Sequence, residues 1–193
     1  MALTPSTMQL SLGAAAPDFS LPDPDGKIHG LADFAGRPAL VVAFICNHCP
    51  YVKHVAPAFA RLAKGYQEQG VGVVAINAND CEHYLDDSPA KMKEEIALRG
   101  YTFPYLVDQS QQVAKAYRAA CTPDFYLFDA DRKLVYRGQM DASRPGNNLP
   151  VTGKDLREAI DAVLAGRPVS KDQRPSMGCN IKWRPGNSPE YFG

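Results

Sequence analysis

The sequence lacks any apolar run long enough to cross a bilayer. Its longest run covers residues 39–46, whereas a membrane-spanning helix needs about 20 apolar residues. The first 20 residues contain no Lys or Arg and no continuous apolar block, so they do not have the pattern of a signal peptide. We therefore expect a cytoplasmic protein that has no membrane as a partner.

An excess of charge of either sign is also missing. Lys plus Arg and Asp plus Glu each number 21, which gives a formal net charge of zero, and no long run of like charges occurs. Proteins that bind nucleic acid usually carry a basic surface, so we expect no nucleic-acid partner. Hydrophobic residues make up 45% of the chain, which is enough for a sizeable folded core.

Cysteines are few and odd in number, which excludes the disulfide framework of a small secreted domain. The five are Cys46, Cys49, Cys81, Cys121 and Cys179. Only Cys46 and Cys49 are close in sequence, and there is no second Cys-x-x-Cys. In a cytosolic chain such a pair beside a strand–helix pattern indicates first a redox centre and second a metal site.

Apolar periodicity and turn signals predict alternating strands and helices, hence an α/β fold with a central mixed sheet flanked by helices. The predicted strands cover 19–21, 27–31, 39–45, 71–77, 103–107, 125–128 and 134–137, and the predicted helices cover about 50–69, 89–99, 110–119 and 152–166. The first two strands form an N-terminal hairpin around Asp25-Gly26. We expect one domain over 1–166 and an irregular tail, 167–193, packed on or near it.

The pair lies where the buried strand 39–45 meets the following helix. Cys49 directly precedes Pro50, a residue that suits the first helical position, so Cys49 is expected at the helix N-terminus. The positive end of the helix dipole would favour a thiolate there, and a protonated His48 would favour it further. Cys46 supplies a second thiol for disulfide formation.

Two other interpretations of the pair stay open. Cys46 and Cys49 could supply two zinc ligands, with His54 or another cysteine (Cys81, Cys121 or Cys179) completing the set. They could also be two buried thiols without chemistry. The position of the pair at a helix start, beside His and Pro, favours the redox interpretation.

These features resemble the thioredoxin-fold superfamily, in particular its redoxin branch, which is AhpC/TSA-like. The resemblance rests on the cysteine pair at a helix start, on Pro57 within that helix, and on Thr122-Pro123 before the closing strands. Residues 77–110 look like the redoxin-type insertion, and 16–21 like the redoxin opening. The resemblance covers about 14–166 and implies a cis-proline at Pro123 that faces the cysteines. A cis bond would leave the Thr122 backbone open to an extended substrate strand.

The resemblance also bears on which sulfur attacks. In similar sequences the attacking cysteine lies five residues after a strand Phe and eight before the helix proline. Counted from Phe44 and from Pro57, Cys49 satisfies both distances. A rival alignment with a short deletion makes Cys46 the attacker, so both alternatives stay open.

We interpret the chain as a thiol–disulfide oxidoreductase. The expected catalytic residues are Cys46, Cys49, His48, Thr122 and Pro123. Its partners would be protein or small-molecule disulfides and thiols together with a thiol reductant, and neither a cofactor nor a metal is expected.

Two other functions are alternatives. The first is a thiol peroxidase, in which Cys49 attacks peroxide and Cys46 or Cys179 resolves it. The peroxiredoxin pattern Pro-x-x-x-Thr-x-x-Cys is not met, because Val42 and Cys46 replace its Pro and Thr. The second is a zinc-binding or redox-sensing module.

Two cysteines outside the pair have no assigned role. Cys179 either anchors the tail by packing, together with Trp183, or serves as an additional redox thiol near the pair. Cys121 is either a third redox thiol or a small buried residue beside the Thr122-Pro123 loop.

Overall fold

The computed structural model describes residues 3–192 and contains a five-stranded mixed sheet. Its strand order is β6-β5-β4-β8-β9. The bounds are β4 Leu40–Phe44, β5 Gly72–Asn77, β6 Tyr105–Val107, β8 Asp124–Phe128 and β9 Leu134–Gly138. β4, β5 and β6 are parallel to one another. β8 pairs antiparallel with β4, and β9 at the sheet edge pairs antiparallel with β8. The mixed sheet expected from the sequence is confirmed.

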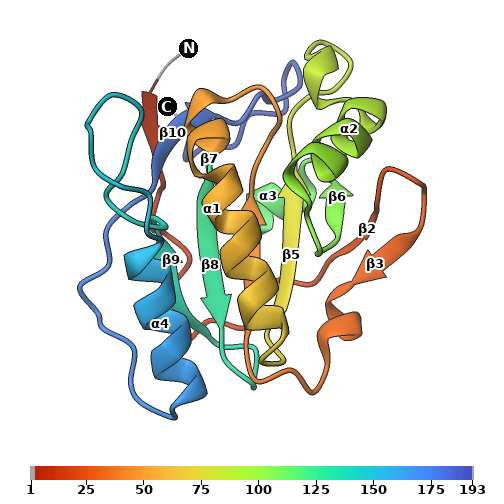
Figure 1. Ribbon diagram of the computed structural model, residues 1–193. Coiled ribbons are helices and arrows are strands. Elements are labelled where there is room, and N and C mark those ends of the chain that lie inside the picture. Colours follow the sequence, from red (N-terminus) through yellow and green to blue (C-terminus); the bar gives the residue numbers. More distant parts are fainter. Residues whose placement is uncertain (1–2, 193) are drawn as a thin grey trace.

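Helices cover one face of this sheet, and a mixed layer covers the other. α1 (Pro50–Gln67), α2 (Pro89–Arg99) and α4 (Lys154–Leu164) share one hydrophobic cluster with the strands. α3 (Gln112–Ala116) and the N-terminal hairpin of β2 (Ser20–Pro22) and β3 (Ile28–Gly30) pack with the opposite side of β4 and β5. In Figure 1, α1 and α4 lie in front of the sheet and α3 lies behind it. Because both faces are covered, β4 and β5 consist of buried residues throughout.

α1 is the helix that carries the cysteine pair at its start. Cys49 is its N-cap residue, Pro50 occupies its first turn, and the helix continues through Pro57. Its apolar residues recur on one side and are buried against the sheet: Val52, Val55, Ala56, Phe59, Ala60, Leu62, Ala63 and Tyr66. The position of Cys49 at the helix N-terminus is therefore confirmed.

The tail contains a strand that the sequence did not predict. β10 (Met177–Asn180) is the middle strand of a small antiparallel sheet, between β1 (Leu3–Pro5) and β7 (Cys121–Thr122). The residues of β10 have no strong strand pattern, and only the backbone partners on both sides make it a strand. Figure 1 shows β10 and β7 beside the start of α1.

The third helix is shorter than the predicted 110–119. It begins after Gln111, which has a left-handed backbone (φ 63°), and ends at Ala116, and Arg118 is again left-handed (φ 57°). The Asp108 carboxylate accepts the Ala114 backbone amide at 2.9 Å, so a side chain from the preceding loop fixes where this helix starts.

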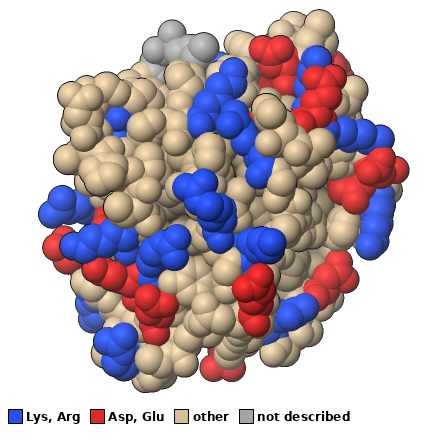
Figure 2. All heavy atoms as spheres, in the orientation of Figure 1, with Lys and Arg blue, Asp and Glu red and all other residues tan. Residues whose placement is uncertain are grey.

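Short connecting elements complete the chain. Two 3₁₀ turns, Leu31–Phe34 and Leu85–Asp87, lead into β4 and α2. Among the described helices, none is both long and apolar enough to cross a membrane. On the face seen in Figure 2, side chains of both charge signs are interspersed, with no wide region of a single sign.

Candidate redox site

The site forms where β4 ends and α1 begins. β4 ends at Phe44 and α1 begins at Pro50. The motif Cys46-Asn47-His48-Cys49 therefore lies in the turn between the carboxyl end of this central strand and the start of the helix. Cys46 is 1% exposed and Cys49 is 0% exposed. Carboxyl ends of parallel strands followed by helix starts are common positions for sites in such sheets.

The Thr122-Pro123 loop brings a threonine against both sulfurs. The peptide bond between these residues is cis, as the resemblance implied. The Cys46 Sγ lies 3.1 Å from Thr122 Oγ1, and the Cys49 Sγ lies 3.3 Å from the Thr122 carbonyl oxygen. A residue 73 positions away from Cys49 in sequence thus contacts both members of the pair.

Hydrogen bonds at the helix start stabilise a Cys49 thiolate. The Cys46 thiol donates to the Cys49 sulfur and lowers the pKa of Cys49 to about 5, against the opposing effect of burial. The Cys179 thiol and the backbone amides of Val52 and Cys179 also lower it. Hydrogen bonds to an ionised acceptor are stronger than those to a neutral one, which favours the charged form. These donors therefore favour the thiolate form of Cys49.

The pKa of Cys46, the other member of the pair, shifts in the opposite direction. Burial raises the pKa of Cys46 well above its ordinary value, and the neighbouring Cys49 and the Asp87 carboxylate raise it further. Cys46 is thus a neutral thiol that donates to its neighbour. The two cysteines differ because Cys49 accepts hydrogen bonds, above all from the Cys46 thiol, whereas burial dominates at Cys46. The position of Cys49 at the helix N-terminus adds the backbone amide of Val52 to these donors.

His48 is held by an aspartate and not by a thiol. Its Nδ1 lies 2.5 Å from Asp87 Oδ2, and its ring stacks on Tyr84 at 5.7 Å between centroids. The hydrogen bonds that lower the pKa of Cys49 come from other residues, as described above. One atom from each of Cys46, His48 and Asp87 lies within 4.8 Å of the others, so the imidazole is close to Cys46.

Asp87 is a site residue that sequence reasoning missed. It is 1% exposed and accepts hydrogen bonds from the Asn47 amide at 2.7 Å, from Asn79 Nδ2 at 2.8 Å and from Asn77 Nδ2 at 3.2 Å, besides its contact with His48. Against the cost of burial, these donors hold its pKa below the usual value. No local pattern around Asp87 indicates this role, because its partners come from β5 and from the loop before α1.

The Thr122 backbone is not open, contrary to the expectation that it would pair with a substrate strand. Cys179 is directly opposite Thr122 in the β10–β7 ladder. A Cβ on Gly178 would lie 1.9 Å from the Thr122 carbonyl oxygen, so only glycine allows this approach. The tail of the same chain therefore occupies that backbone edge, and it buries Cys179 to 3% exposure beside Cys49.

The remaining cysteines and His54 do not join the pair as a zinc set. The Cys121 sulfur contacts the Pro123 carbonyl oxygen at 3.8 Å, and burial raises its pKa well above the ordinary value. His54 Nε2 pairs with Ser143 Oγ at 2.7 Å. Among the described residues, the one group with metal-ligand spacing is Cys46, His48 and Asp87, and the Asp87 oxygens in it are engaged by four donors.

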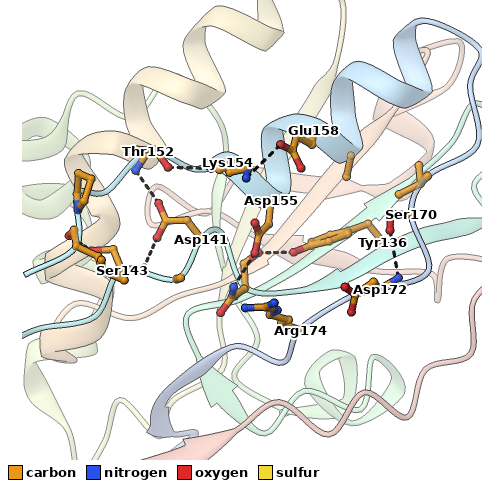
Figure 3. A pocket seen from close by; sticks show the side chains of 16 residues that line it. Tyr136, Asp141, Ser143, Thr152, Lys154, Asp155, Glu158, Ser170, Asp172 and Arg174 are labelled. Carbon is orange, nitrogen blue, oxygen red and sulfur yellow. Dashed lines mark hydrogen bonds and ion pairs between the residues drawn. The ribbon is translucent and has the colours of Figure 1, made fainter. Parts of the chain in front are cut away.

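Two pockets differ in their relation to the cysteines. The pocket in Figure 3, of about 470 Å³, lies between β9, α4 and the tail, and its lining includes no cysteine. Asp141, which turns into it, accepts backbone amides of Thr152 and Gly153, so it serves the loop before α4. A second pocket of about 780 Å³ borders His48, Tyr84 and the tail residues Asn180 and Lys182. This second pocket adjoins the redox site.

Comparison with sequence families gives a match over most of the chain. The model of the AhpC/TSA family matches residues 12–137. A protein named thiol-disulfide oxidoreductase ResA, from Geobacillus thermodenitrificans, is 32% identical over 157 residues, which cover 80% of this chain and 79% of that protein.

Solved structures give matches at two levels of similarity. A conserved protein of Geobacillus kaustophilus superposes with a TM-score of 0.94 at 55% identity, covering 96% of this chain and 98% of the other. The thioredoxin domain of a thiol-disulfide oxidoreductase from Bacteroides vulgatus superposes with a TM-score of 0.59 at 18% identity, covering 77% of this chain and 98% of that one. The second likeness concerns the fold alone, and the thioredoxin-like fold expected from the sequence is confirmed.

Proposed function

The chain belongs to the AhpC/TSA family and is a thiol–disulfide oxidoreductase, and from this premise we propose that Cys49 is its attacking sulfur and Cys46 its partner. The observation that carries the proposal is the contrast between two adjacent thiols: the pKa of Cys49 is lowered to about 5, whereas that of Cys46 is raised well above the ordinary value. The thiolate is the nucleophile in disulfide exchange, so Cys49 reacts first.

In the first step the Cys49 thiolate attacks one sulfur of a substrate disulfide. A bond forms between Cys49 and that sulfur, and the substrate's other sulfur leaves as a thiolate. The Cys46 and Cys179 thiols then no longer donate hydrogen bonds to a Cys49 thiolate, because its sulfur is bonded to the substrate. Thr122 and Pro123 border the reacting sulfur and define where the substrate can approach.

In the second step the Cys46 thiol attacks the Cys49 sulfur and expels the remaining substrate thiol. Cys46 must lose its proton for this attack, and its high pKa opposes the loss. His48 lies near the Cys46 sulfur and is held by Asp87, which supports a role for this imidazole as the proton acceptor. A thiol reductant then returns the Cys46–Cys49 disulfide to the dithiol.

Burial supports small substrates in preference to extended protein strands. Cys46 and Cys49 are at most 1% exposed, and β10 takes the Thr122 backbone that a substrate strand would otherwise pair with. The pocket beside His48 and Tyr84 offers open space of about 780 Å³ next to the site. We therefore favour small-molecule disulfides and thiols as partners. The cytoplasmic setting expected from the sequence remains a proposal.

Turnover of a small disulfide by single-cysteine variants tests this function. With hydroxyethyl disulfide as substrate and dithiothreitol as reductant, Cys49→Ser is expected to abolish catalysis. Cys46→Ser should still form the Cys49 adduct, and Cys81→Ser, outside the site, should retain full activity. Activity of Cys49→Ser equal to that of the unaltered protein would rule the assignment out.

A thiol peroxidase is the second candidate, and the buried, low-pKa Cys49 favours it because peroxide is small enough to reach a covered sulfur. Peroxide would oxidise Cys49 to a sulfenic acid. The Cys46 thiol would then condense with this sulfenic acid to give a disulfide and water. Peroxide consumption coupled to a thiol donor and lost in Cys49→Ser would support this reaction. No consumption by a protein that turns over hydroxyethyl disulfide would exclude it.

A zinc module is disfavoured by the hydrogen bonds of Asp87. Its carboxylate would have to release donors from Asn47, Asn77, Asn79 and His48 to bind a metal. Stoichiometric zinc in protein purified under reducing conditions, without disulfide turnover, would revive this alternative.

A further inference from the structure

The tail strand β10 brings a third thiol to the reacting sulfur. Cys179 lies opposite Thr122 in the ladder, and Thr122 contacts the Cys49 sulfur through its carbonyl oxygen. Cys46, Cys49 and Cys179 belong to one buried cluster. The Cys179 thiol and its backbone amide both hydrogen-bond Cys49. The Cys49 sulfur therefore has two thiol neighbours, Cys46 from the loop between β4 and α1 and Cys179 from the tail strand β10.

The structure holds Cys179 at this position from both ends of β10. After it, the Ile181 amide donates to the Ala120 carbonyl oxygen at 2.9 Å, and the Lys182 amide donates to Asn79 Oδ1 at 2.8 Å. Before it, Gly178 passes so close to Thr122 that a side chain would collide. This segment is fixed as part of the site, and a thiol held within hydrogen-bonding distance needs only a small movement to form a disulfide.

The charges around the two neighbouring thiols differ in sign. Asp87 faces Cys46, whereas the ammonium of Lys182 acts on Cys179 and opposes the burial that raises the pKa of Cys179 to about 12. Lys182 Nζ is held 2.7 Å from the Asn180 carbonyl oxygen and 2.8 Å from Asn180 Oδ1, two residues from Lys182 in the tail. A thiolate forming at Cys179 during attack would thus meet a positive neighbour, and one forming at Cys46 would meet a negative one.

We propose that Cys179 is a second resolving thiol, which attacks the Cys49 mixed disulfide and closes a Cys49–Cys179 disulfide. The inference rests on the proposed function, because it requires Cys49 to react first. The bond between Cys49 and the substrate sulfur breaks, a bond between Cys49 and Cys179 forms, and the Cys179 proton leaves with the expelled thiol. One substrate disulfide is reduced to two thiols, and the two protein thiols are oxidised to one disulfide.

The test removes Cys46 so that only Cys179 can resolve. Reduced Cys46→Ser is mixed with hydroxyethyl disulfide, quenched with acid at successive times, and mapped by peptide mass spectrometry without reduction. We expect the Cys49 adduct to appear first and then to be replaced by a linked pair of peptides containing Cys49 and Cys179. In Cys46→Ser/Cys179→Ser the adduct should persist at least tenfold longer. The matched control is Cys46→Ser/Cys121→Ser, because Cys121 is on the partner strand but contacts Pro123; it should behave like Cys46→Ser.

Two results separate failure of the inference from failure of the proposed function. If the adduct persists equally with and without Cys179 in folded variants, Cys179 is not a resolving thiol and the inference falls, while the role of Cys49 stands. If no adduct forms on Cys49 in any variant, the proposed function itself fails and the inference fails with it. Circular dichroism checks that each variant is folded. If Cys46→Ser/Cys179→Ser does not fold, the comparison is repeated with Cys46→Ser/Cys179→Ala.

Discussion

At the scale of single residues, the reactivity of the site depends on a donor that is itself a cysteine. The Cys46 thiol is the main cause of the lowered pKa of Cys49. We expect Cys46→Ala, which removes that donor, to move the pKa of Cys49 upward from about 5. Titration of the thiolate by its ultraviolet absorbance measures this pKa directly. Cys81→Ala is the control and should leave the titration near pH 5 unchanged. An unshifted midpoint in Cys46→Ala would show that Cys46 does not stabilise the thiolate.

Asp87 is the second residue on which the site depends. Replacing it by Ala leaves buried amide donors of Asn47, Asn77 and Asn79 without an acceptor, so we expect Asp87→Ala to lower the free energy of unfolding by about 3 kcal/mol. Urea denaturation measures this value. The adjacent exposed Asp86 provides a matched control, and Asp86→Ala should change stability by less than about 0.5 kcal/mol. Equal effects of the two substitutions would contradict the role of the buried network.

At the scale of elements, the position of β10 depends on one glycine. A Cβ at Gly178 would meet the Thr122 carbonyl oxygen, so Gly178→Ala should push β10 away from β7 and cost about 1–3 kcal/mol. We also expect faster hydrogen exchange at the Ile181 amide, which bonds across to Ala120. Gly65→Ala is the control, because a Cβ there meets nothing within 4 Å and should stabilise α1 slightly. Unchanged Ile181 exchange in Gly178→Ala would contradict the close approach.

The elements also show what the sequence could and could not predict. β4 and α1 were predictable because a continuous apolar run and a 3.6-residue pattern identify them locally, and with them the place of Cys49 at a helix start. β10 was not predictable, because Met177–Asn180 becomes a strand only through partners more than 50 residues away in sequence. Asp87 was missed for the same reason: its acceptor role exists only once β5 and the loop before α1 are assembled around it.

At the scale of the whole molecule, the Cys49 thiolate links stability to pH. The folded-state pKa of about 5 lies below the ordinary thiol value of 9.0, so folding favours the thiolate. This contribution is complete above about pH 9, declines as the pH falls, and is lost below about pH 5. We expect the stability difference between reduced protein and Cys49→Ser to shrink across this range. Urea denaturation in excess dithiothreitol at several pH values measures it, and a pH-independent difference would contradict the lowered pKa.

The measurement that tests the account most directly is the alkylation rate of each cysteine in the reduced, unaltered protein as a function of pH. Peptide mass spectrometry after short exposure to iodoacetamide assigns the label to individual cysteines. We expect Cys49 to be labelled first, at a rate that is half-maximal near pH 5 and constant at neutral pH, while Cys46 and Cys179 react slowly there. Rapid labelling of Cys46 near neutral pH, with Cys49 unreactive, would contradict it and would make Cys46 the attacking sulfur.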